Sequence, residues 1–127
     1  MIRTAQTVLQ KLGFDSDVEL SITFVKDAYI KKLNKSYRGK CQPTDVLSFS
    51  TAPDFPCVTN YIGDVVISVD TAKRNAVSDG RSLKEELITL VIHGILHLAG
   101  YDHERSGEKE AGRMMKKQRE LLREVLP

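Results

Sequence analysis

Residues 93–103, HGILHLAGYDH, contain all three histidines of the chain. His93 and His97 are four positions apart, so on a helix both imidazoles share one face, about 6 Å apart along the axis. Gly100 can take a left-handed conformation that ends the helix and lets the chain bring His103 back toward the pair. Three imidazoles with a fourth position open are typical of a catalytic metal site, because structural zinc is normally closed by four protein ligands. The pattern therefore predicts that His93, His97 and His103 bind one divalent ion per chain, with zinc the first choice and nickel or copper also suited.

The spacing H-x-x-x-H-x-x-G-x-x-H is that of the metzincin metallopeptidases. In those enzymes a glutamate directly follows the first histidine and takes a proton from the activated water. The corresponding residue here is Gly94, which has no side chain. The spacing thus predicts a zincin-like metal site but disfavours peptide hydrolysis by the metzincin mechanism.

The elements around this stretch indicate an α+β fold, with helices packed on a small mixed sheet. The histidine helix begins at the capping box Ser82-Leu83-Lys84-Glu85 and continues to Leu98. Hydrophobic periodicity predicts strands over residues 18–24, 46–50 and 61–69 and helices over residues 3–12, 27–38, 70–80 and 111–125. Strands thus fall mainly in the first half and helices in the second.

The sequence also predicts helix caps and the buried faces of two helices. Asp27 and Asp70 are each expected to cap the helix that follows. The first of these helices should bury Ala28, Ile30, Leu33 and Tyr37. The terminal helix should bury one stripe, formed by Ala111, Met114, Met115, Gln118, Leu121, Leu122 and Val125.

Length and composition place the chain among ordinary globular proteins. It has 127 residues, 41% of them hydrophobic and 28% charged, which predicts one domain over residues 1–127. No apolar run approaches the roughly twenty residues of a membrane span, and no signal peptide is visible, so the expected location is cytoplasmic. The two cysteines, Cys41 and Cys57, are then expected to be reduced thiols outside the metal site.

The formal net charge is only +2, but basic residues cluster between residues 26 and 40. Six basic residues stand there against Asp27 alone: Lys26, Lys31, Lys32, Lys35, Arg38 and Lys40. Such a stripe can attract phosphate groups, although a solvated helix face explains it equally simply. Arg38 ends the stripe, and a guanidinium can bind a phosphate through two parallel hydrogen bonds.

Three separate segments resemble the YbeY family of bacterial endoribonucleases, which acts in ribosomal RNA maturation. Residues 93–103 are similar to its metal signature, and residues 61–68, YIGDVVIS, are similar to its GDI-type strand. LNKSYR at 33–38, followed by PTDVLSF at 43–49, resembles its second signature. Ser50 stands where the family usually has proline. The resemblance covers about residues 20–125.

The resemblance implies a metal-dependent endoribonuclease that cleaves single-stranded RNA, like the factor for 16S ribosomal RNA 3′-end maturation and ribosome quality control. It implies that His93, His97 and His103 hold the metal and that Arg38 is the functional arginine beside them. The implied partners are ribosomal RNA, the small ribosomal subunit and its assembly factors, with no membrane.

Two other functions stay open at this point. One is a non-catalytic ribosome-assembly factor whose metal only shapes an RNA-binding groove, and the other is a metallopeptidase with a base supplied from elsewhere. Arg38 has its own alternative, a surface salt bridge. Asp102 can orient a ligating histidine or form the turn, and Ser48 can line the cleft or follow ordinary strand alternation.

Overall fold

The computed structural model describes residues 1–50, 60–101 and 107–126. For residues 107–111 it describes the backbone but not the side chains. Its helices are α1 (Ile2–Lys11), α2 (Asp27–Arg38), α3 (Val69–Asp79), α4 (Leu83–Leu98) and α5 (Gly107–Val125). Its strands are β1 (Glu19–Val25), β2 (Val46–Ser50) and β3 (Tyr61–Ser68). The α+β class is confirmed, and the predicted elements agree closely with these bounds.

The three strands form one mixed sheet in the order β1-β3-β2. β3 lies in the centre, parallel to β1 and antiparallel to β2. This central place explains the run Val65-Val66-Ile67, all buried: successive side chains point to opposite faces, and both faces are covered.

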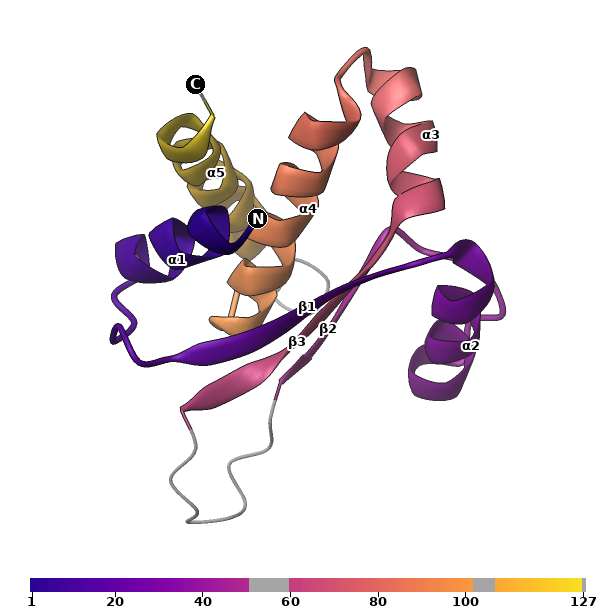
Figure 1. Ribbon diagram of the computed structural model, residues 1–127, viewed down its shortest axis with the longest axis horizontal. Helices are drawn as coiled ribbons and strands as arrows, with labels where there is room; N and C mark the ends of the chain where they lie inside the picture. The colour runs from indigo at the N-terminus through magenta and orange to yellow at the C-terminus, as the bar shows by residue number, and fades with distance from the viewer. Residues whose placement is uncertain (51–59, 102–106, 127) are drawn as a thin grey trace.

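The helices form two layers on the sheet (Figure 1). Val65 and Ile67 belong to the larger core, which the sheet shares with α1, α4 and α5. Val66 points to the other face, where it packs with Ile30 of α2 and Leu47 of β2. α2 and α4 therefore cover opposite faces of the sheet.

The N-termini of α2 and α3 lie together because β1 and β3 are parallel and end side by side, with Val25 opposite Ser68. The predicted caps are wrong here. Lys26 occupies the N-cap position of α2 without a side-chain cap, and Ser68 caps α3 by accepting from the Thr71 amide. Asp27 and Asp70 instead join the two helices, since the Asp27 amide donates to Asp70 Oδ2 at 3.0 Å.

The buried face of α2 also differs from the prediction. Ile30 is buried and Leu33 half-buried, but Ala28 and Tyr37 are exposed. The other buried residue is Asn34, whose Nδ2 donates to the Gln42 carbonyl at 2.8 Å. The buried face of α2 is thus rotated toward the loop that follows the helix. Asn34 is buried there because its side chain donates a hydrogen bond to a backbone carbonyl of that loop.

The capping box of α4 is confirmed in its serine half: Ser82 Oγ accepts from the Glu85 amide at 3.1 Å, and the Glu85 carboxylate accepts from the same hydroxyl. On α5, Met114 and Leu121 are buried as expected, whereas Met115 is 49% exposed, contrary to the prediction.

Cys41 is an exposed free thiol, and Cys57 lies outside the described residues. None of the helices in the described ranges has the length and apolar character needed to cross a bilayer.

Candidate metal centre

The structure brings His93 and His97 together on one face of α4. Their Nε2 atoms are 3.1 Å apart, and their rings meet edge to face with centroids 4.7 Å apart. Two nitrogens bound to one tetrahedral zinc at about 2.0–2.1 Å would be about 3.4 Å apart. The two imidazoles therefore already have nearly the separation of a pair of zinc ligands, and a metal ion fits these residues.

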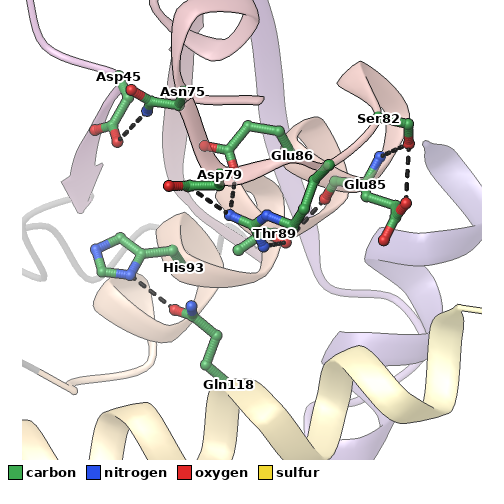
Figure 2. Close-up of polar contacts among 10 residues, drawn as sticks. Asp45, Asn75, Asp79, Ser82, Glu85, Glu86, Thr89, His93 and Gln118 are labelled. Atoms are coloured by element: carbon green, nitrogen blue, oxygen red, sulfur yellow. Dashed lines mark hydrogen bonds and ion pairs between the residues drawn. The ribbon is translucent and has the colours of Figure 1, made fainter. Parts of the chain in front are cut away.

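Gln118 of α5 contacts His93, as Figure 2 shows. Its Oε1 lies 2.9 Å from Nδ1 of His93. In the tautomer in which Nδ1 donates to this oxygen, Nε2 of His93 has a lone pair that faces Nε2 of His97 and is the atom that would bind a metal. The sequence pattern had placed Gln118 only in the core stripe of the terminal helix. Its contact with His93 depends on how α4 and α5 cross, which helical periodicity does not specify.

Gly94 packs directly against the sheet. A Cβ at this position would meet Cγ1 of Val65 at 2.5 Å and Oγ of Ser48 at 3.2 Å. No side chain fits without moving the helix, so the missing glutamate of the metzincin pattern has a steric reason here. Ser48 in turn donates from Oγ to the Gly94 carbonyl at 3.0 Å, which fixes β2 beside the histidine helix.

Arg38 is the last residue of α2 and is exposed. Its neighbour Tyr37 packs on Phe49 with ring centroids 4.8 Å apart, while Ser48, the residue before Phe49, contacts Gly94 beside His93. Tyr37 at the end of α2 and Gly94 beside His93 thus contact adjacent residues of β2.

The third predicted ligand cannot be placed in the same way. His103 and Asp102 lie outside the described residues. Within the described residues no group of three His, Cys, Asp or Glu side chains could hold an ion, so the centre there consists of two histidines and Gln118. Gly100 has the predicted left-handed conformation at the end of α4, with φ of 99°.

The chain is similar to proteins of one family along nearly its whole length. Residues 1–126 match the family described as "Endoribonuclease YbeY". A protein of that name from Pelotomaculum thermopropionicum is 45% identical over 126 residues, covering 96% of this chain and 82% of that protein. Another, from Aquifex aeolicus, is 50% identical over 122 residues, covering 96% and 77%.

A solved structure agrees with the fold. The solution structure of TM1509 from Thermotoga maritima superposes with a TM-score of 0.68 at 34% identity, covering 98% of this chain and 77% of that one. Matches of this extent and identity, over both the sheet and the histidine helix, show that the chain belongs to the endoribonuclease YbeY family.

Proposed function

We propose that this protein cleaves single-stranded RNA at a metal centre formed by His93, His97 and His103. The observation that carries the proposal is the convergence of the two imidazole Nε2 atoms, 3.1 Å apart. The hydrogen bond from His93 Nδ1 to Gln118 leaves the lone pair of His93 on the metal side. His103 is proposed as the third ligand because Gly100 turns the chain just before it.

Membership of the endoribonuclease YbeY family makes the protein a hydrolase that acts on RNA. The endoribonuclease interpretation is therefore favoured over the assembly factor and the peptidase. The tight packing of Gly94 against Val65 argues further against a peptidase, because no base can be built at that position.

A divalent ion held at this centre supplies a Lewis acid for the scissile phosphate. The imidazoles fix its position, and Gln118 holds the ring of His93 in the orientation that binding requires. Arg38 is proposed to bind a phosphate with its guanidinium as the RNA passes β2, since this exposed arginine ends a basic helix whose Tyr37 packs on Phe49 of that strand. Its role is then to hold the RNA and to offset charge at phosphorus.

The finer assignments are also proposals. Zinc is the expected metal because imidazole ligands suit it, and ribosomal RNA is the expected substrate, with the small ribosomal subunit and its assembly factors as partners in the cytoplasm. Residues 1–127 are proposed to act as one domain, in keeping with the core that α1, α4 and α5 share with the sheet.

The direct test compares RNA cleavage by the parent and by a His97→Ala variant purified in parallel. Lys84→Ala is the matched control, because Lys84 is an exposed residue of the same helix. We expect cleavage by the parent and the control and none by folded His97→Ala. Equal cleavage by all three would point to a contaminating nuclease and overturn the proposal. The product ends identify the nucleophile: a 2′,3′-cyclic phosphate indicates the ribose 2′-hydroxyl and excludes direct attack by water.

A further inference from the structure

A second groove lies on the face of the sheet opposite the histidines. It has a volume of about 430 Å³ and lies between α2 and the strands. Three aromatic residues, Tyr29, Tyr37 and Phe49, line it together with the polar residues Thr23, Ser50 and Asp64. The hydrogen bonds described above for His93 and His97 involve Gln118 and the two histidines themselves, and not these side chains.

The aromatic side of this groove is unusually open. Tyr37 is 68% exposed and Tyr29 is 55% exposed. Tyr37 is held in place by Phe49, with the two rings tilted at 59°. An exposed ring with a fixed orientation at the wall of a groove can stack on a nucleobase, which is the usual way that proteins bind single-stranded RNA.

The charge of α2 fits a polyanion that would lie along the groove. Its basic stripe is exposed at every position, and the described residues provide no ion-pair partner for its lysines: Lys26, Lys31, Lys32, Lys35 and Lys40. Lys32 precedes the groove residue Leu33. Lys32 is three residues after Tyr29 on the same helix, and an ammonium group near an exposed ring is complementary to a phosphate next to a stacked base.

The floor of the groove offers hydrogen-bond acceptors. Asp64 of β3 is held there by the Tyr61 hydroxyl, which donates to Oδ1. The adjacent carboxylate raises the pKa of Tyr61, so this hydroxyl stays a donor. A carboxylate at the bottom of the groove can accept from the amino or imino groups of a base, whereas it would repel a phosphate.

We propose that this groove binds one base of the single-stranded RNA substrate, stacked on Tyr37 with its edge toward Asp64, while Lys32 of α2 binds a neighbouring phosphate. The inference rests on the proposed function and adds to it a binding site distinct from the metal centre. Among the described residues, β2 connects the two sites, since Phe49 contacts Tyr37 and the preceding Ser48 contacts Gly94. The RNA would therefore pass over the edge strand β2 between them.

The test measures the affinity of a fluorescent single-stranded RNA of about 12 nucleotides, a length within the range that such sites cover. Binding is followed by anisotropy in a folded His97→Ala background, where the RNA stays intact. We expect Tyr37→Ala to weaken binding about 5- to 100-fold, the effect of losing one stacked base. Tyr37→Phe, which keeps the ring, should bind like the background protein. Affinity should fall steeply as salt is raised.

A second readout uses the protein with its histidines intact. Tyr37→Ala should raise KM for the same RNA and leave kcat nearly unchanged, because the ring binds substrate away from the cleaved bond. Unchanged affinity and KM in Tyr37→Ala, or an equal loss in Tyr37→Phe, would overturn the groove assignment while leaving the endoribonuclease intact. A parent that neither binds nor cleaves RNA would instead overturn the proposed function, and the groove assignment with it.

Discussion

Gln118 decides which nitrogen of His93 is available to a metal. A histidine four residues from another can turn either ring nitrogen toward its partner, and the pair alone does not specify which. The amide oxygen 2.9 Å from Nδ1 makes that nitrogen the donor and directs Nε2 toward His97. Such outer hydrogen bonds orient metal ligands and raise their basicity.

Removing this hydrogen bond should weaken metal binding without removing a ligand. We expect Gln118→Leu to lower the affinity for zinc about 10- to 100-fold, in competition with a chromogenic chelator. Gln118→Glu keeps an acceptor and should restore most of that affinity. Met115→Ala is the control on the same helix, because Met115 is half exposed. Unchanged affinity in Gln118→Leu would show that the amide does not orient the histidine.

At the scale of elements, a cluster of hydrogen bonds joins the starts of α2 and α3. The Asp27 carboxylate accepts from the Ser68 and Thr71 hydroxyls, each at 2.6 Å, and from the Arg74 guanidinium at 2.6 Å. The hydroxyls first, and then the guanidinium, lower the pKa of Asp27 from 3.8 to about 2. Since α2 carries the basic stripe and Arg38, this cluster also fixes the proposed RNA-binding helix to the sheet.

The lowered pKa makes this stabilisation dependent on pH. Above about pH 4 the carboxylate is charged in the folded and unfolded states and its bonds contribute in full; the contribution is lost as the pH falls from about 4 to about 2. Asp27→Asn should cost about 1–2 kcal/mol in the free energy of unfolding at neutral pH, after allowance for solvent screening at this quarter-exposed group. Urea unfolding of the parent and of Asp27→Asn at several pH values measures this difference in the free energy of unfolding. The difference from the parent should shrink toward pH 2, and Asp15→Asn, at an exposed site, should show no such difference. A constant difference at all pH values would contradict this account.

Most elements were predictable from the sequence because their signals are local. The strand β1, the Ser82 cap and the spacing of His93 and His97 depend only on neighbouring residues, and the structure agrees with all three. Phe24, however, is exposed near the end of β1 instead of half-buried like Leu20 and Ile22. The failures depend on contacts between distant segments. Tyr37 is exposed and Asn34 buried because the loop after α2 supplies a carbonyl for the asparagine, and Gln118 meets His93 only because α4 and α5 cross there.

At the scale of the whole molecule, α4 connects the metal centre to the core. Its Ile92, Ile95 and Leu96 are fully buried among residues of the sheet and of α1 and α5. The same helix carries His93 and His97, and Gln118 ties it to α5. A metal that binds only the folded arrangement therefore stabilises the whole fold and not just its site.

Removal of the metal should accordingly lower the melting temperature of the protein. A free ion at 100 times its dissociation constant stabilises by about 2.7 kcal/mol, or about 10 °C for a chain of this size. We expect EDTA to lower the melting temperature of zinc-loaded parent and of Lys84→Ala by about that amount in differential scanning calorimetry. His97→Ala should melt near the value of the metal-free parent and respond little to EDTA. Elemental analysis should show that EDTA has removed the zinc. A parent that has lost its zinc and still melts at the same temperature would show that these histidines do not couple metal binding to the fold.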